Sequence, residues 1–246
     1  MLDRFAAAWR FLTVFPFPGR YGEGGALGRS LAMFPVVGAV LGGLAWLVAT
    51  ALGLVLPPLP LAMLVVAAMA LFSFGLHMDG LADCADALLS LGRSRERALE
   101  VMRDSRIGAH GALALCLVLL LKVACLASMP VAKMALAALA APVAGRAAMF
   151  FPMLLLPYLR DEGLGKIFAR THAAPLLAYG VAAVAALSWA ALGVSSGGVA
   201  VGAWAFVVAL WVYFLRRRLG GATGDCYGAA CELGEAAFVL GAAVVI

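Results

Sequence analysis

Six predominantly apolar runs, each long enough to cross a lipid bilayer as a helix, constrain this chain more than any other feature of its sequence. A crossing helix needs about 20 residues. The composition agrees, because 65% of the 246 residues are hydrophobic and 13% are charged, whereas soluble domains carry about 25% charged residues. The sequence therefore predicts an all-α, polytopic transmembrane bundle of six to seven helices in a single domain, residues 1–246, with runs at 31–56, 59–78, 111–129, 131–158, 173–194 and 197–215.

Uncharged turns separate several of these runs and predict antiparallel helical hairpins, namely PPLP at 57–60, Pro130 and SSGG at 195–198. A seventh apolar run, 236–246, is too short to cross alone. It either extends back toward Tyr227 as a helix that carries Glu232 and Glu235 in its first turns, or ends as a half-span.

The N-terminal segment, residues 1–30, is interrupted by charges and prolines and does not resemble a signal peptide. We expect an amphipathic helix at the membrane interface, with Phe5, Trp9 and Phe11 toward lipid. A frayed terminus is the alternative.

The charge distribution predicts the orientation of the bundle. Three turns on one side contain no basic residue, whereas basic residues gather on the other side, in 1–30, 79–110, 159–172 and at Arg216, Arg217 and Arg218. The positive-inside rule then places the N-terminus and the longer loops in the cytoplasm. All 13 acidic residues fall on the same side. We therefore expect a cytoplasm-facing polar active site above a membrane-embedded bundle.

Three aspartates, Asp79, Asp83 and Asp86, follow one another at spacings of four and three in HMDGLADCADALLS, residues 77–90. On a helix these positions share a face, where like charges repel unless something offsets them. Hard carboxylate oxygens suit Mg²⁺ or Mn²⁺. Gly80 and Ala82 leave room for a bulky phosphorylated ligand. These aspartates are predicted catalytic metal ligands, with a solvated acidic helix end as the alternative.

The loop that ends segment 79–110 places Arg103 and Arg106 around Asp104 and Ser105. Guanidinium groups suit phosphate oxygens. We predict that the two arginines and Ser105 contact phosphate and that Asp104 is a fourth metal ligand with a catalytic role. The preceding arginines are interpreted as basic anchors: Arg93, Arg95 and Arg97.

A glycine-rich segment, GGATGDCYGAACELGE at 220–235, allows backbone amides to approach an anion closely. Asp225 and Glu232 lie seven residues apart and form a second metal-competent pair on a helix. The segment lacks the ending of a phosphate-binding P-loop, and a glycine-rich hinge is the alternative.

Three basic side chains lie inside apolar runs. Arg146 is expected either to reach the phosphate site or to pair with a carboxylate, because a charge there is costly. Lys122 and Lys133 are expected to extend toward the far membrane surface. Among the histidines, His77 beside Asp79 is the one to test.

Carboxylates, arginines and a glycine-rich anion loop are the components of metal-assisted phosphoryl-type transfer. A carboxylate can also accept the proton of an attacking hydroxyl. Because no Ser-His-Asp set or activated thiol is apparent, the sequence favours direct displacement at phosphorus.

Six segments of the sequence resemble motifs of the cobalamin synthase family. They are FLTVFPFP at 11–18, FPVVGAVLG at 34–42, HMDGLADCADAL at 77–88, EVMRDSRIGAHG at 100–111, GR at 145–146 and GGATGDCYGAACELGE at 220–235. This resemblance implies an Mg²⁺-dependent multi-pass enzyme of the bacterial cytoplasmic membrane, an adenosylcobinamide-GDP ribazoletransferase. It would join α-ribazole, or its 5′-phosphate, to adenosylcobinamide-GDP, release GMP and form adenosylcobalamin or its phosphate, in the assembly of the vitamin B12 nucleotide loop.

The resemblance also implies roles for individual residues. Asp79, Asp83 and Asp86 would bind metal, and Asp225 and Glu232 would hold a second metal or orient the acceptor. The phosphate contacts would be Arg103, Ser105, Arg106, Arg146, Thr223 and Gly224. Cys84 and Cys226 depart from the small or polar residues expected at those two positions. The expected partners are the two substrates and the bilayer, not nucleic acid; a homo-oligomer or an association with other cobalamin-assembly enzymes is left open.

Two rival functions remain at this point. CDP-alcohol phosphotransferases also carry a DG-x-x-A helix, but Asp83 replaces the arginine expected there, and their later aspartate pattern is absent. A transporter would place ionisable residues near the bilayer midplane, where Arg146 is the one good candidate.

Overall fold

The computed structural model describes residues 1–17, 25–89, 94–160, 167–168 and 173–244, so that Arg93 lies outside the described residues. Over these ranges the chain forms helices, in the order α1 (Leu2–Leu12), α2 (Gly25–Gly28), η1 (Leu31–Met33), α3 (Phe34–Leu52), α4 (Pro58–Phe72), α5 (Leu76–Leu88), α6 (Arg95–Val101), α7 (Ala109–Ala127), α8 (Val131–Ala148), α9 (Phe150–Leu155), α10 (Ala173–Arg218) and α11 (Gly224–Val244). Within the described ranges, extended segments pair at one isolated β-bridge, between Tyr158 and Ala222. The all-α prediction is confirmed.

Five helices are long and apolar enough to cross a membrane, and the bent pair α4–α5 gives a sixth if it counts as one span. The five are Leu31–Leu52, Ala109–Ala127, Val131–Leu155, Ala174–Arg218 and Gly224–Val244. These lengths confirm a multi-pass membrane protein. Its orientation in the bilayer stays a prediction.

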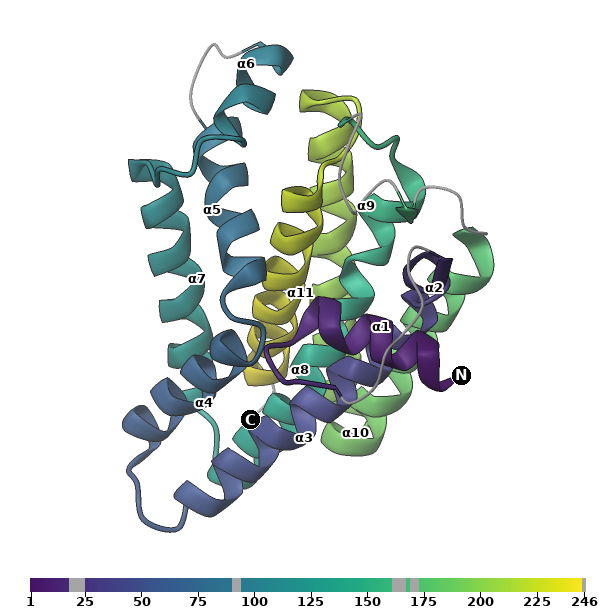
Figure 1. The fold of residues 1–246 in the computed structure, drawn as a ribbon. Coiled ribbons are helices and arrows are strands. Elements are labelled where there is room, and N and C mark those ends of the chain that lie inside the picture. The colour runs from purple at the N-terminus through teal and green to yellow at the C-terminus, as the bar shows by residue number, and fades with distance from the viewer. Residues whose placement is uncertain (18–24, 90–93, 161–166, 169–172, 245–246) are drawn as a thin grey trace.

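The two most buried of the five candidate spans, α8 and α11, occupy the middle of the bundle, with α7 and α10 at its flanks (Figure 1). Small residues let helices approach α8 closely, as expected where dispersion contacts drive packing in lipid. A Cβ atom added to Gly38 of α3 would lie 2.6 Å from the carbonyl oxygen of Pro142 in α8. The long apolar side chains of the flanking helices remain exposed, for example Leu117 of α7 and Phe206 of α10.

Helix α10 contains a sharp reversal at Gly193, whose φ of 76° and ψ of 172° are not helical. Beyond the reversal the chain folds back, because a Cβ at Gly197 would lie 2.7 Å from the carbonyl oxygen of Ser188. The stretch therefore consists of two antiparallel helices, as the apolar runs predict. The turn was expected at SSGG, residues 195–198, which instead is helical. Glycine alone adopts the backbone conformation of residue 193 without strain.

The expected run 59–78 is not straight. Helix α4 ends at Phe72, and α5 starts at Leu76 with its axis turned by 90°. Phe74 and Gly75 form the corner with left-handed φ values of 53° and 69°. As a result, the aspartates of α5 lie on a helix whose direction differs from that of the apolar span before it, which the sequence did not indicate.

Both ends of the chain pack on the bundle. Helix α11 begins at Gly224 and includes Glu232 and Glu235, which confirms the longer of the two alternatives for the C-terminal run. At the N-terminus, α1 forms as predicted, and Trp9 donates a hydrogen bond from Nε1 to the carbonyl oxygen of Phe15 at 3.0 Å. The prediction that Phe11 faces lipid is wrong, because its ring lies against the rings of Phe34 and Phe168, with centroids 5.9 and 5.8 Å away.

Candidate active site

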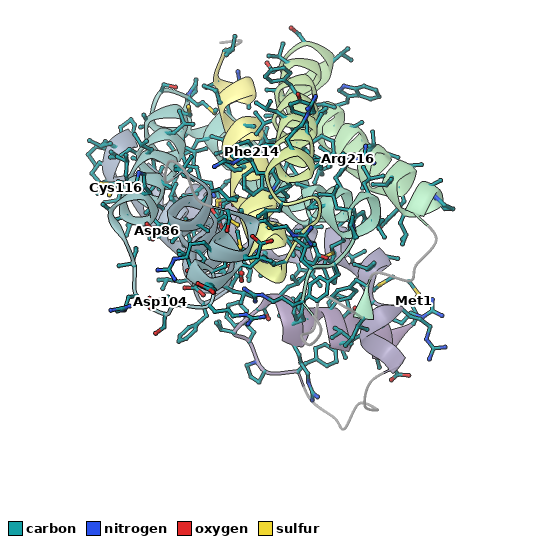
Figure 2. The ribbon with its side chains drawn as sticks, turned by 90° about the horizontal axis from the view of Figure 1, so that it is seen from above. Met1, Asp86, Asp104, Cys116, Phe214 and Arg216 are labelled. Atoms are coloured by element: carbon teal, nitrogen blue, oxygen red, sulfur yellow. The ribbon has the colours of Figure 1, made fainter. Side chains whose placement is uncertain are left out.

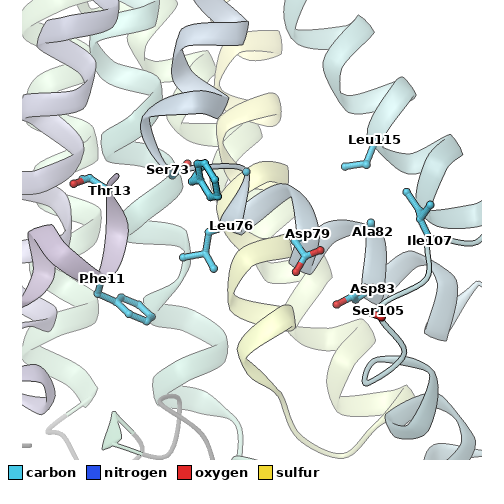
Figure 3. Close-up of a pocket in the computed structure, with 12 residues that line it drawn as sticks. Phe11, Thr13, Ser73, Leu76, Asp79, Ala82, Asp83, Ser105, Ile107 and Leu115 are labelled. Carbon is cyan, nitrogen blue, oxygen red and sulfur yellow. The ribbon is translucent and has the colours of Figure 1, made fainter. Parts of the chain in front are cut away.

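A cavity of about 580 Å³ opens between α1, α5 and the segment that precedes α7 (Figure 3). Asp79 and Asp83 project into it from α5, one helical turn apart, and Ser105 lies opposite Asp83. Apolar side chains form the rest of its wall, among them Phe11, Leu76, Ile107 and Leu115. This cavity thus places two carboxylates beside an apolar surface.

A second cavity of about 220 Å³ adjoins the first, because Phe11, Leu76 and Asp79 line both. Its other charged residues are Arg160 and Asp225, the latter at the start of α11. Asp79 therefore stands at the junction of two cavities, with Asp83 on one side and Asp225 on the other.

The carboxylates meet because α5 and α11 cross at two glycines. A Cβ at Gly80 would lie 2.7 Å from the carbonyl oxygen of Asp225, and one at Gly228 would lie 3.2 Å from that of His77. Any larger residue would push the helices apart. The charge of Asp79 acts on Asp83 along the same helix, and the charge of Asp225 acts on it from across this crossing.

Arg160 balances part of this negative charge. Its Nη2 donates to Asp225 Oδ2 at 2.6 Å and to the carbonyl oxygen of Met102 at 3.1 Å. The bridge of Tyr158 to Ala222 fixes the segment that carries Arg160, with Leu159 N donating to Ala222 O at 3.0 Å. Burial raises the pKa of the Tyr158 phenol, which therefore stays protonated at neutral pH.

Thr223 and Gly224 precede Asp225 and affect it differently. The Thr223 hydroxyl is buried and donates to Asp225 Oδ2 at 3.2 Å. This contact orients the carboxylate, so the structure gives Thr223 a partner other than the phosphate we predicted. Gly224 lines the second cavity as the first residue of α11, where unpaired backbone N–H groups favour an anion.

Asp86 does not accompany Asp79 and Asp83 into the cavities that the described side chains line. Its carboxylate accepts hydrogen bonds from the backbone N–H groups of Gly108 and Gly111, at 2.7 and 2.9 Å. A Cβ at Gly108 would lie 2.8 Å from Asp86 Cγ, so these glycines are needed for the contact. Asp86 thus caps the start of α7, and the expectation of three aspartates around one metal is not supported.

Asp104 and Arg106 form an exposed pair with each other. Arg106 Nε and Nη2 donate to the two oxygens of Asp104 at 2.9 and 2.6 Å. The side chain and then the backbone N–H of Arg106 lower the pKa of Asp104 to about 2. Asp104 lies on the same side of the molecule as Asp86 (Figure 2), but its carboxylate is already occupied, which argues against a fourth metal ligand. Arg103 is exposed.

Comparisons with known proteins agree with this arrangement. The chain matches the family model for cobalamin-5-phosphate synthase over residues 4–243. The chain belongs to the cobalamin-5-phosphate synthase family. It is 40% identical over 255 residues to the adenosylcobinamide-GDP ribazoletransferase of Klebsiella pneumoniae, with 98% of this chain and 99% of the relative covered.

Two further relatives are also named adenosylcobinamide-GDP ribazoletransferase. The protein of Pseudomonas fluorescens is 41% identical, with 89% of each chain covered. That of Desulforamulus reducens is 38% identical, with 96% of this chain and 94% of the relative covered. No solved structure matches the chain significantly.

The remaining predicted residues lie deeper in the bundle, in a buried ion cluster of Lys122, Arg146, Glu232 and Glu235. Lys122 Nζ donates to Glu232 at 2.6 Å and to Glu235 at 2.8 Å, and Arg146 pairs with Glu235. All four side chains are at most 4% exposed. Charges removed from water in this way must be paired.

The buried ion cluster corrects three expectations. Glu232 does not join Asp225, because Lys122 holds it within the bundle. Arg146 pairs with a carboxylate, which was one of its two alternatives, and lines neither of the two cavities. Lys122 does not extend to the far surface, because its side chain is 2% exposed and its ammonium group contacts two glutamates.

The donor set at the cavities fits a divalent cation held jointly with substrate. The described residues contain no group of three or more His, Cys, Asp or Glu side chains arranged to hold a metal on their own. Mg²⁺, however, is usually bound by one or two carboxylates together with waters and substrate phosphates. Asp79 and Asp83 supply two such carboxylates on adjacent turns, and they line the cavity beside Ser105.

The sequence patterns missed four residues that line the cavities: Phe11, Tyr158, Arg160 and Tyr227. Arg160 was counted among the basic residues that set the orientation, and its pairing with Asp225 bridges 65 positions in the chain. No local pattern carries such information. Tyr227 lies within the glycine-rich segment. A polar aromatic residue among small residues was the one pattern that could have indicated it as a cavity residue.

Proposed function

We propose that this protein transfers the cobinamide phosphate of adenosylcobinamide-GDP to α-ribazole, or to its 5′-phosphate, with release of GMP. The near full-length match to proteins named for this activity supports the proposal. The observation that carries it is the pair of adjoining cavities with Asp79 at their junction. A reaction between two large substrates requires two binding spaces that meet at one reacting centre.

In this reaction the 3′-hydroxyl of the ribazole attacks the phosphorus that bears cobinamide. A new P–O bond forms to the ribose oxygen, the P–O bond of the diphosphate breaks, and GMP leaves with its phosphate. A carboxylate at the junction can accept the hydroxyl proton, and Asp79 occupies that position.

The residues of the site also position the reacting groups and neutralise charge. Asp79 and Asp83 would hold Mg²⁺, or Mn²⁺ in its place, and the cation would neutralise the phosphate oxygens and stabilise the departing GMP. Arg160 and Thr223 fix the carboxylate of Asp225 beside the junction. Gly224, the first residue of α11, lines the second cavity, and the start of a helix would favour an anionic substrate group.

The proposal includes the location of the enzyme. We infer a bacterial cytoplasmic membrane protein whose N-terminus and active site face the cytoplasm, as the basic residues of the loops suggest. Both nucleotide substrates are polar and would then reach the cavities from the aqueous side.

The test is GMP release by the purified protein from adenosylcobinamide-GDP and α-ribazole, with Mg²⁺ and then with EDTA. Release should require both substrates and should stop when the metal is removed. Asp79→Asn and Asp83→Asn should each lower kcat by about 10²-fold or more, as the loss of transition-state charge stabilisation does elsewhere. Asp3→Asn, on the exposed face of α1, is the matched control and should retain full activity.

Near-normal rates for both aspartate variants would contradict the metal assignment. Absence of GMP release from a folded sample would contradict the transferase proposal, and a CDP-alcohol would be the next donor to test.

A further inference from the structure

The second cavity gathers buried polar atoms that have no partner. Among the described residues, five buried side-chain nitrogen or oxygen atoms make no hydrogen bond: Nδ1 and Nε2 of His77, Nε of Arg146, Nε of Arg160 and the hydroxyl of Tyr227. Four of these five atoms belong to residues that line this one cavity. Buried polar groups in native proteins are nearly always paired, and each exception calls for an explanation.

These atoms are deeply buried and chemically complementary. His77 and Tyr227 are 1% and 3% exposed. The ring nitrogens of His77 and the hydroxyl of Tyr227 make no hydrogen bond to the described residues. A neutral imidazole ring offers one donor and one acceptor, a phenol offers both, and Arg160 Nε adds a donor. Such a mixed, largely uncharged set suits hydroxyl groups and ring nitrogens rather than a phosphate, which would need several donors.

Besides Asp79 and Asp225, aromatic and apolar side chains line the cavity. Tyr158 and Tyr227 face it with ring centroids 6.3 Å apart and planes inclined by 34°. Phe11 and Met149 complete the wall. At about 220 Å³ the space lies below the range of roughly 300–1,000 Å³ that holds drug-sized ligands, so a corrinoid does not fit, whereas a planar heterocycle packed against these aromatic rings does.

We propose that the second cavity is the acceptor subsite, in which the heterocyclic base of the ribazole packs against Tyr158 and Tyr227. His77 and the Tyr227 hydroxyl would bind the polar atoms of the base and its ribose. This inference rests on the proposed function. The donor then occupies the larger first cavity, and the acceptor hydroxyl enters the junction at Asp79 from the opposite side.

The test measures binding of α-ribazole to the purified, donor-free protein by calorimetry, together with the KM for each substrate. Tyr227→Phe keeps the ring and removes the unpaired hydroxyl, so the Kd for α-ribazole should rise about 3–10-fold, the loss of one hydrogen bond. The KM for adenosylcobinamide-GDP should stay unchanged. Tyr179→Phe removes the hydroxyl of an exposed tyrosine on α10 and is the matched control, expected to bind like the wild type.

His77 is tested by two substitutions. His77→Phe should weaken α-ribazole binding, and His77→Gln, which restores a donor and an acceptor, should recover part of it. Thermal unfolding establishes whether each variant is folded. If His77→Phe is not folded, the α-ribazole affinities of Tyr227→Phe and His77→Gln test the subsite.

The outcomes separate the two levels of inference. Unchanged α-ribazole affinity in Tyr227→Phe and in a folded His77 variant, with normal wild-type turnover, overturns the subsite and leaves the proposed function intact. A rise in the KM of the donor instead of the acceptor also overturns it, because the cavity would then hold the donor. No turnover by the wild type with both substrates overturns the proposed function and the subsite together.

Discussion

The substitution Lys122→Met tests whether the buried ion cluster stabilises the bundle through charge balance. Lys122 contacts Glu232 at 2.6 Å and Glu235 at 2.8 Å, and Arg146 is the other cation of the cluster. The four charges sum to zero. Removing the ammonium group leaves two buried carboxylates against one guanidinium, which is an uncompensated charge in a region that water does not reach.

The expected loss of stability is large. Breaking a buried pair by removing one partner costs about 3–5 kcal/mol, which corresponds to a decrease of about 10²- to 10³-fold or more in the folding equilibrium. For a chain of this size each kcal/mol shifts Tm by roughly 2–4 °C, so Tm should fall by about 6–20 °C. Thermal unfolding of the protein in one detergent, followed by tryptophan fluorescence, measures the shift.

A double variant separates charge balance from lost packing. Lys122→Met with Glu232→Gln restores neutrality around the remaining pair of Arg146 and Glu235, and Tm should recover by at least half of the loss. Lys133→Met, which removes a lysine that is only half-buried on α8, is the matched control and should lower Tm much less. A single variant within about 1 kcal/mol of the wild type, or a double variant no more stable than the single, would refute the reasoning.

Two further predictions concern the segment between α5 and α7. Gly111→Ala should lower Tm, because its Cβ would lie 3.1 Å from Asp86 Cγ and the displaced carboxylate would lose charged hydrogen bonds worth about 1.5–3 kcal/mol each; an unchanged Tm in the thermal assay would contradict the capping role. Asp104 should stay ionised until the pH falls through about 2, since its depressed pKa keeps the pair with Arg106 intact below the ordinary value of 3.8. Carboxyl ¹³C NMR should report this titration, and Arg106→Ala should raise the pKa.

The sequence was sufficient for the fold class because membrane helices leave a direct signal. Runs of about 20 apolar residues predicted the bundle, and the two halves of α10 follow them, whereas α11 extends N-terminally beyond its apolar run at 236–246. The corners were less predictable. The reversal at Gly193 was assigned to the SSGG segment a few residues later, and the 90° corner before Leu76 falls inside an apolar run. Hydropathy reports that residues avoid water and carries no information on where a helix turns.

The site was predictable as far as its residues lie on one helix. The spacing of Asp79 and Asp83 places both on one face of α5, and both line the larger cavity. The same spacing also selected Asp86, whose carboxylate turns to the backbone of Gly108 and Gly111 instead. The difference depends on where α7 begins in space. Helical periodicity alone therefore cannot separate a ligand from a helix cap.

Charge balance distinguishes the two acidic clusters that the sequence presents as alike. Both use carboxylates of α11, and at about 1.5 Å per residue the seven positions from Asp225 to Glu232 span roughly 10 Å along its axis. The deeper set, the buried ion cluster, is neutral. Around the cavities, three carboxylates face the single guanidinium of Arg160, a formal net charge of −2 among the described side chains that line them. A purely structural cluster in a membrane bundle would be selected toward neutrality. The remaining deficit equals the charge of one divalent cation, and this imbalance is the physical reason to seek the metal at Asp79 and Asp83 and not at Glu232.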